Sequence, residues 1–451
     1  MTAQPTAPTR TGSRVLLQGF FADPSFDYGI RNILGATAYG VGDVGTVLAT
    51  AARIIDGDWA SWFSAWTDRA DRLAALGARR RDARDLRGAS WAFLAAADAW
   101  SRSLDAVDGL PTEQGEAVLL PTFRKGRDCW EALIDCSDSR FLRVDVPYED
   151  TALPGYLLRP DATGTGRPTL VMTNGSDGPI TAMWSAGAAE ALDRGWNAFL
   201  YDGPGQQSML FERGTTFRPD WEAVLTPVVD ALIGRPDVDA TALAAYGISQ
   251  AGYWVPRALA FEHRFVAAVA DPGVVDVSTS WMEHLPGEML QLLDAGSKDD
   301  FDRYMSQTGG DAQTARTFAY RARPFGMSSP FDLFTEVRRY QLRDVVGGIR
   351  TPLLITDPED EQFWPGQSQQ LAGLLTAPHA VTHDRVPLVL SGGRQGVRRV
   401  ATPVSPPETA TSVFDVSPQV LERLVGRAVT PSPPAEAETG ARENCTKTGS
   451  G

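Results

Sequence analysis

The alternation of short apolar runs with amphipathic segments between residues 140 and 275 constrains this chain more than any other feature of its sequence. The runs that predict buried strands lie at 169–173, 197–201, 242–246 and 265–270. The segments between them repeat their apolar residues at helical spacing. Strands that alternate with helices form a mostly parallel sheet with helices on both faces. The expected fold class is therefore α/β, with a doubly wound, mostly parallel sheet.

The segments that flank this core differ from it in composition and in the spacing of their apolar residues. The 451 residues also exceed the usual size of one compact domain. Residues 276–345 interrupt the alternation with charged helical sequence, in the position of a lid inserted between two sheet strands, and the strand pattern returns at 352–355. The predicted organisation is a disordered leader at 1–25, a helical N-terminal cap domain at 26–138, a first core part at 139–275, the helical lid at 276–345, a last core part at 346–428 that is aberrant from about 385, and a disordered tail at 429–451.

Large aromatic side chains recur at helical spacing in the N-terminal segment. Trp59, Trp62 and Trp66 share one face of a predicted helix, and Trp100 adds bulk to a second helix over 82–107. Buried packing is the ordinary role of such a stripe. Contact with a ligand is the alternative, and both roles hold together if the helices cover a pocket.

Charge and composition exclude several classes of function. The formal net charge is −14 and no cluster of Lys and Arg is evident, so nucleic acid is not an expected partner. The apolar stretch 15–21 is too short for a signal peptide, and no run approaches the length of a membrane span. The three cysteines, an odd count without metal-ligand spacing, predict free thiols. We expect a cytoplasmic protein without a nucleic-acid or membrane partner.

A nucleophile motif occupies the junction between the strand at 242–246 and the helix that follows it. Residues 247–252 read GISQAG, a G-x-S-x-G elbow with Ala in the last position. A sharp strand-to-helix turn needs small residues around the serine, and it projects the serine hydroxyl over the edge of the sheet. The same turn directs the N–H of Gln250 toward the carbonyl under attack. Ser249 is therefore the predicted nucleophile, and a structural serine in an ordinary turn is the alternative.

Two further loops follow strands of the predicted sheet. Residues 174–178 read NGSDG, a small Gly-rich loop in the place where elbow enzymes carry their second oxyanion donor. We nominate the backbone N–H of Ser176 as this donor, with that of Asp177 as the alternative, and an ordinary turn built from turn-forming residues stays open. Residues 202–207 read DGPGQQ and are expected to shape the floor of the site.

Carboxylates gather after the predicted strand at 352–355. They are Asp357, Glu359, Asp360 and Glu361. A triad acid must orient a histidine and stabilise its positive charge from a loop just past a strand end. Asp360 fits this role best because it lies beyond the turn at Pro358 and just before the apolar Phe363. The other three carboxylates are its rivals, and a solvated acidic loop is the alternative.

The general base has to come from few histidines. They are His263, His284, His379 and His383. The first two fall at the end of the helix after the nucleophile and in the lid segment, where neither is placed to serve it. The other two follow Asp360, as the chain order of nucleophile, acid and base requires, within a predicted last strand at 377–384. His383 lies nearer to the strand end and is the predicted base.

Segments along most of the chain carry a resemblance to a known family. They are 33–40 (ILGATAYG), 61–63 (SWF) with Trp66, 153–156 (LPGY), 174–178 (NGSDG), 202–207 (DGPGQQ), 247–252 (GISQAG) and 361–367 (EQFWPGQ). On these segments residues 25–375 resemble the α/β-hydrolase group that includes FrsA-like proteins, 2,6-dihydroxypseudooxynicotine hydrolase and fungal polyketide-pathway hydrolases. The resemblance implies an α/β-hydrolase sheet under a helical cap, Ser249 and Asp360 in the triad, and hydrolysis of an ester or of a ketone C–C bond.

The C-terminal part departs from the pattern of this family. Similar proteins carry a His-Cys-Glu-Pro segment shortly before a terminal helix that opens with Val-Phe-Asp. Here residues 413–415 read VFD, whereas the His-Cys-Glu-Pro position falls at about 400–403 and reads VATP. The segment 384–411 is rich in Arg, Pro, Gly and Ser, which motivates the hypothesis of a local frameshift. Resequencing that finds the frame intact would leave His383 as the base or an impaired enzyme.

These residues together predict a serine hydrolase with a triad of Ser249, His383 and Asp360. Ser249 attacks a carbonyl carbon, the N–H groups of Gln250 and Ser176 hold the oxyanion, and water releases the acyl-enzyme. The expected partner is a small-molecule acyl or ketone substrate, no metal or organic cofactor is expected, and a homodimer is an open alternative to a monomer. The rival functions are an acyltransferase of secondary metabolism and a catalytically impaired hydrolase-fold binding protein.

Overall fold

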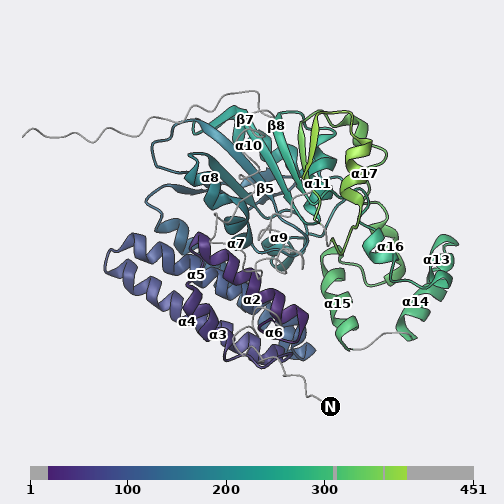
Figure 1. The fold of residues 1–451 in the computed structure, drawn as a ribbon, viewed down its shortest axis with the longest axis horizontal. Coiled ribbons are helices and arrows are strands. Elements are labelled where there is room, and N and C mark those ends of the chain that lie inside the picture. The colour runs from purple at the N-terminus through teal and green to yellow at the C-terminus, as the bar shows by residue number, and fades with distance from the viewer. Residues whose placement is uncertain (1–18, 308–311, 359–360, 383–451) are drawn as a thin grey trace, which may run out of the picture.

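The computed structural model describes residues 19–307, 312–358 and 361–382, and its centre is one large sheet (Figure 1). The sheet has eight strands in the order β1-β4-β6-β5-β7-β8-β9-β10. These strands are β1 (Phe141–Arg143), β4 (Gly155–Leu158), β5 (Arg167–Thr173), β6 (Asn197–Tyr201), β7 (Val238–Ile248), β8 (Phe265–Asp271), β9 (Leu353–Thr356) and β10 (His379–Thr382). All pairs from β6 to β10 are parallel, and β4 is antiparallel to both of its neighbours. The predicted doubly wound α/β class is confirmed.

The two faces of the sheet belong to two separate hydrophobic cores, because successive side chains of a strand point to opposite faces. In β5, Leu170 and Met172 enter the core that the cap helices share, whereas Val171 enters the other core. The first face is covered by α7 (Ile180–Met183) and α8 (Ala189–Asp193). The second face is covered by α10 (Glu222–Ile233), α11 (Ala251–Leu259) and α17 (Gln367–Leu374). This double cover explains why the strand sequences are apolar without alternation.

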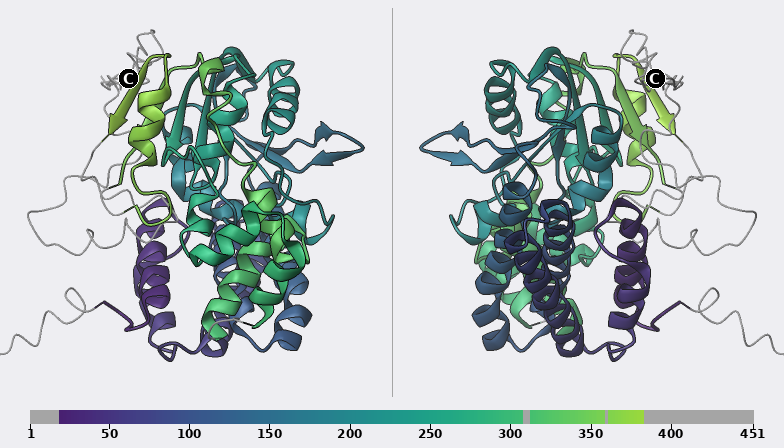
Figure 2. Two further views of the ribbon diagram at one scale, coloured as in Figure 1. Left: turned by 90° about the vertical axis from the view of Figure 1, so that its right-hand side faces the viewer. Right: turned by 90° about the vertical axis from the view of Figure 1, so that its left-hand side faces the viewer.

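The N-terminal helices form a cap at one end of the sheet (Figures 1 and 2). They are α2 (Pro24–Ala36), α3 (Val44–Ala51), α4 (Trp59–Asp82), α5 (Leu86–Leu104) and α6 (Thr112–Asp135). Aspartate carboxylates accept backbone N–H groups at the N-termini of the first four, and these residues are Asp23, Asp43, Asp58 and Asp85. Trp62 and Trp66 are buried, so the predicted packing role of the aromatic stripe is confirmed.

Buried polar contacts fix the cap to the sheet. Arg127 of α6 forms an ion pair with Asp202, which follows β6, and donates a hydrogen bond of 3.0 Å to the hydroxyl of Tyr156 in β4. Burial by itself lowers the pKa of Arg127, but the charges and hydrogen bonds of Asp202 and Tyr156 together raise it above its usual value, so the guanidinium stays charged. On the other side of the cap, the indole of Trp184 donates to the carbonyl oxygen of Tyr39 at 2.8 Å.

A helical insertion lies between β8 and β9, in the segment for which the sequence predicts a lid, and it is called the lid below (Figure 1). Its helices are α12 (Thr279–Met282), α13 (Gly287–Asp294), α14 (Lys298–Gln307), α15 (Ala312–Ala322) and α16 (Pro330–Val337). Met289, Leu293, Phe301 and Phe334 form a small core inside it. The segment after α15 reaches the cap, where Arg323 forms an ion pair with Asp108.

The remaining elements are short. A two-stranded ribbon of β2 (Val146–Tyr148) and β3 (Thr151–Leu153) stands apart from the main sheet, and α9 (Gln207–Phe211) follows the loop after β6. Among the described residues, no helix combines the length and the apolar content that crossing a membrane requires. Cys129 and Cys136 are buried free thiols, as predicted, and burial raises the pKa of Cys129 to about 12.

Candidate active site

Ser249 lies in the turn between β7 and α11, in a backbone conformation that L-residues rarely adopt. Its φ is 56°, within the left-handed region. Its N–H donates to the carbonyl oxygen of Asp271 at 2.6 Å, and its own carbonyl oxygen accepts from the N–H of Gly252 at 2.8 Å. These two bonds hold the strained turn in place. The side chain is half-buried and borders a cavity.

The small residues around Ser249 are required by close contacts, as the elbow pattern predicts. A Cβ atom on Gly247 would lie 2.3 Å from the carbonyl oxygen of Ala251, and one on Gly252 would lie 1.8 Å from that of Pro272. In the neighbouring loop, a Cβ atom on Gly175 would lie 2.9 Å from the Cβ atom of Ser249. A side chain at any of these glycines would therefore displace backbone or the serine itself.

The loop after β5 packs against the nucleophile and is braced by side-chain amides. The amide nitrogen of Asn174 donates to the carbonyl oxygen of Gly178 at 2.8 Å, and its amide oxygen accepts the N–H of Gly175 at 2.9 Å. From the loop after β6, Gln206 Nε2 donates to the carbonyl oxygens of Asn174 and Gly175 at 2.7 and 3.0 Å. The loop at 202–207 thus supports the loop that was predicted to hold an oxyanion donor.

Backbone N–H groups without an acceptor border the cavity at Ser249. Within the described residues, the N–H groups of Gln250 and Ser176 donate no hydrogen bond, and both residues line the cavity. The same is true of Asp177, the alternative donor. Backbone donors away from water are almost always paired, so unpaired ones beside a nucleophile are available to an anionic ligand. This arrangement can stabilise negative charge that develops on an attacked carbonyl oxygen.

The cavity at Ser249 lies between the sheet edge and the lid, with an open volume of about 650 Å³. Its aromatic walls are Phe217, Trp281, Phe325, Phe363 and Trp364. Tyr320 of α15 also lines it and donates from its hydroxyl to Asp177 at 2.9 Å, which joins the lid to the loop after β5. Phe363 and Trp364, which follow the carboxylate loop in the sequence, border the same cavity as the nucleophile.

Only part of the predicted carboxylate loop falls within the described residues. Asp360, the predicted acid, and its rival Glu359 lie outside them. The other two rivals are engaged locally. Asp357 accepts from a glutamine of α17 at 2.7 Å, and Glu361 accepts the N–H of Phe363 at 2.9 Å, so its carboxylate caps its own turn.

The predicted base, His383, also lies outside the described residues, as does the segment for which a frameshift is hypothesised. His379 opens β10 and His263 precedes β8, so both lie at the opposite end of the parallel strands from Ser249. His284 is exposed in the lid. Among the described residues no histidine lines the cavity at the nucleophile, and no group of three or more His, Cys, Asp or Glu side chains could hold a metal ion.

Asp271 is a buried carboxylate at the site that the sequence reasoning missed. It ends β8 and accepts hydrogen bonds from the hydroxyls of Tyr246 at 2.6 Å and Thr356 at 2.5 Å, on the two adjacent strands. Burial raises the pKa of its carboxyl. Because its carbonyl oxygen accepts the N–H of Ser249, Asp271 ties the nucleophile's turn to the middle of the sheet. A lone carboxylate at the end of an apolar strand was the available signal.

Solved structures of the same architecture define the class of protein. The crystal structure of the 2,6-dihydroxy-pseudo-oxynicotine hydrolase matches with a TM-score of 0.61 at 16% identity, over 78% of this chain and 88% of that one. AbyA5 matches with a TM-score of 0.51 at 18% identity, over 75% of this chain and 83% of that one. At these identities the likeness concerns the fold alone, a mostly parallel sheet with helices on both faces.

Relatives in sequence place the chain within that class, although no family model matches it. Hydrolase LUC6 of a Fusarium species is 30% identical over 363 residues, 77% of this chain and 85% of LUC6. The 20-hydroxy-prefusarin hydrolase FUS2 of Gibberella moniliformis is 30% identical over 360 residues, 76% of this chain and 84% of FUS2. The alpha/beta hydrolase psoB of Aspergillus fumigatus is 28% identical over 292 residues, 62% of this chain and 65% of psoB. The chain therefore belongs to the α/β-hydrolase family, in a group with these fungal hydrolases, and it is an enzyme of the hydrolase class.

Proposed function

We propose that the protein is a serine hydrolase that cleaves an ester or a ketone C–C bond of a small-molecule acyl substrate. The observation that carries the proposal is the geometry at Ser249, a serine in a left-handed turn that lines a cavity together with residues whose backbone N–H groups have no internal acceptor. A residue other than glycine in this conformation costs on the order of 1–3 kcal/mol, and such strain concentrates at functional sites. A serine in an ordinary turn has no need of it.

The proposed reaction is a double displacement at the carbonyl carbon. Ser249 attacks this carbon and passes its proton to His383, while Asp360 orients the imidazole and stabilises its positive charge. The N–H groups of Gln250 and Ser176 hold the oxyanion. Collapse expels an alkoxide or a carbanion, which takes the proton from the imidazolium. Water, deprotonated by the same imidazole, then hydrolyses the acyl-enzyme and restores Ser249.

The surroundings of the site support this assignment of groups. Phe363 and Trp364, which follow the carboxylate loop in the sequence, line the cavity of Ser249, and the two described rivals of Asp360 accept hydrogen bonds from their own neighbourhood. His383 directly follows β10, which runs parallel to the strand that carries the loop. The aromatic walls suit a small organic substrate, as do the names of the relatives, one of which is a 20-hydroxy-prefusarin hydrolase.

A fluorophosphonate probe tests the nucleophile. The protein should be labelled, Ser249→Ala should abolish labelling, and kcat/KM should fall by at least about 10⁴-fold. Ser280→Ala is the matched control, because Ser280 lines the same cavity and should leave labelling intact. Wild-type protein that resists the probe would favour the rival interpretation of a hydrolase-fold binding protein.

Substitutions in the same assay test the acid and the base. His383→Ala and Asp360→Asn should each slow labelling by about 10³-fold or more, whereas Glu361→Gln, a neighbouring carboxylate, should not. Full labelling of His383→Ala would contradict its assignment as the base. A screen of p-nitrophenyl esters and then aryl ketones identifies the bond that is cleaved. Added alcohols or amines that divert the acyl group from water would favour the acyltransferase alternative.

A further inference from the structure

Gln207, the first residue of α9, has a backbone conformation that only glycine adopts without strain. Its φ is 33°, in the left-handed region, and 8% of the residue is exposed. Among the described residues other than glycine, Gln207 and Ser249 are the two that have a positive φ without being exposed. The others lie in exposed positions, and they are Arg84, Asp138, Ser139 and Glu149. Strain of this kind concentrates at functional sites, so we examine what Gln207 contacts.

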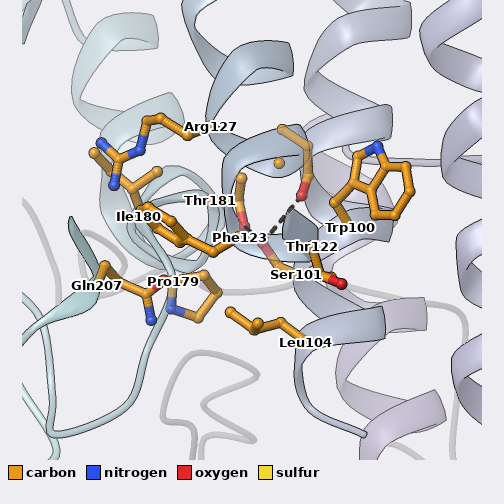
Figure 3. A pocket seen from close by; sticks show the side chains of 12 residues that line it. Trp100, Ser101, Leu104, Thr122, Phe123, Arg127, Pro179, Ile180, Thr181 and Gln207 are labelled. Atoms are coloured by element: carbon orange, nitrogen blue, oxygen red, sulfur yellow. Dashed lines mark hydrogen bonds between the residues drawn. The ribbon is translucent and has the colours of Figure 1, made fainter. Parts of the chain in front are cut away.

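The side chain of Gln207 reaches the loop after β5. Its Nε2 donates a hydrogen bond of 3.3 Å to the carbonyl oxygen of Asp177, which is 30 residues away in the sequence. Figure 3 shows Gln207 beside Pro179, which ends this loop, and both residues line one cavity. Gln206, the residue before it, donates to two other carbonyl oxygens of the same loop. The two glutamines therefore brace this loop at both of its ends.

The bond from Gln207 leaves one polar group of Asp177 without a partner. The carboxylate of Asp177 accepts the hydroxyl of Tyr320 at 2.9 Å and that of Ser176 at 3.3 Å, and its carbonyl oxygen accepts the amide of Gln207. Within the described part of the chain, the N–H of Asp177 and that of Ser176 donate to no acceptor, and both residues line the cavity at Ser249. Because the flanking carbonyl groups are held, the peptide units that carry these N–H groups cannot turn freely.

We propose that Gln207 is a positioning residue for the oxyanion hole. Its amide holds the loop after β5 so that the N–H groups of Ser176 and Asp177 stay directed toward the carbonyl oxygen that becomes negative when Ser249 attacks. The inference rests on the proposed function, and it adds the group that keeps these donors in place before charge develops, which is the condition for their effect. Glycine at residue 207 would relieve the strain, but it would leave the carbonyl of Asp177 without this donor.

Two substitutions separate the amide of Gln207 from its backbone strain. Gln207→Met keeps an unbranched side chain and the strain but removes the donor, whereas Gln207→Gly removes both. Gln114→Met is the matched control, because Gln114 is an exposed glutamine of the cap helix α6. Circular dichroism verifies that each variant is folded.

The measurement compares two inhibitors of p-nitrophenyl acetate hydrolysis that differ in whether they form an oxyanion. Ser249 adds reversibly to the activated carbonyl of phenyl trifluoromethyl ketone. The bond from Oγ to the carbonyl carbon forms, the hydroxyl proton passes to the base, and the former carbonyl oxygen carries the negative charge. Phenyl methyl ketone has the same ring but does not accumulate this adduct, so its inhibition constant reports binding alone.

Both variants of Gln207 should raise the inhibition constant of the trifluoromethyl ketone and lower kcat/KM for the ester by at least about tenfold. The inhibition constant of phenyl methyl ketone should change by less than about threefold, and Gln114→Met should change none of these values. A smaller loss in either folded variant, or an equal loss with both ketones, would overturn the inference. In that case, labelling of the wild type that depends on Ser249 leaves the proposed function intact. A wild type that neither hydrolyses the ester nor is labelled would remove the proposed function and the inference with it.

Discussion

The cap and the lid both pack against the sheet, but they are attached to it in different ways. The cap shares one hydrophobic core with a face of the sheet, and the buried pair of Arg127 and Asp202 anchors it. The lid has a small core of its own around Phe301, but Leu333 and Val337 of α16 belong to the second core of the sheet, and Tyr320 donates a hydrogen bond to the loop after β5. The cap is therefore built as part of the folding unit of the sheet, whereas α13 and α14 of the lid pack within the lid and α16 joins them to the core of the sheet.

The largest effect on stability is expected when the buried ion pair of Arg127 and Asp202, which anchors the cap, is removed. Arg127→Ala should lower the free energy of unfolding by about 3–5 kcal/mol, because it leaves the buried carboxylate of Asp202 without its positive partner and with only the hydrogen bonds from Ser208. Urea denaturation measures the change. A loss below about 1 kcal/mol would mean that the hydrophobic core alone holds the cap.

Damage to the core of the lid should stay within the lid. Phe301 is fully buried and packs edge-on against Phe331 and Phe334, with ring centroids 5.9 and 5.5 Å apart. Phe301→Ala should destabilise this packing by about 3–5 kcal/mol. We expect faster hydrogen exchange in peptides of α13, α14 and α16 and an almost unchanged midpoint of global unfolding. A midpoint that falls as far as in Arg127→Ala would show that lid and sheet unfold together.

The pH dependence of stability tests whether the lid covers the cap in solution. Burial raises the pKa of Asp105, a cap residue that lines a cavity together with Tyr320 and Arg323, to about 6. The folded state then binds the proton more tightly than the unfolded state, so stability is lost as the pH rises from about 4 to about 6. Relative to wild type, Asp105→Asn should gain up to about 1 kcal/mol over this range, a figure reduced for screening because the side chain is partly exposed. Parallel denaturation curves at pH 4 and pH 8 measure the gain, and an equal difference at both values would mean that the lid leaves Asp105 open to water.

The smallest effect is expected three residues before the anchor, at an exposed ion pair. Arg124 of α6 pairs with Glu212 at 3.0 Å, and its side chain is 58% exposed. Arg124→Ala should change the free energy of unfolding by no more than about 0.5 kcal/mol. It removes the same side-chain type from the same helix, so a loss comparable to that of Arg127→Ala in the same urea assay would point to the helix rather than to the buried pair.

Local sequence patterns predicted much of the fold, because strands and helices that are buried carry apolar residues at regular spacing within short segments. The run at 197–201 is β6, and the elbow, the lid insertion and the buried tryptophan stripe lie where the sequence places them. The strand predicted at 242–246 is longer in the structure, from Val238 to Ile248, because its first residues include the exposed Ala240 and Thr241 and lack the apolar pattern of a buried strand.

Contacts between distant segments could not be predicted in this way. Arg127 and Asp202 are 75 residues apart in the sequence, and the residues around each of them do not indicate which residue it pairs with. At the site, Ser249, Gln250 and Ser176 line one cavity, as the loop positions predicted. The acid and the base remain predictions, because Asp360 and His383 lie outside the described residues.

The left-handed backbone conformation at Ser249 lowers the stability of the folded protein at the residue on which its proposed activity depends. Glycine adopts a φ of 56° freely, whereas serine there costs the molecule on the order of 1–3 kcal/mol. The inactive variant Ser249→Gly should therefore unfold at a higher temperature than the native protein. That inert form is the one in which an uncleaved substrate could be seen in place.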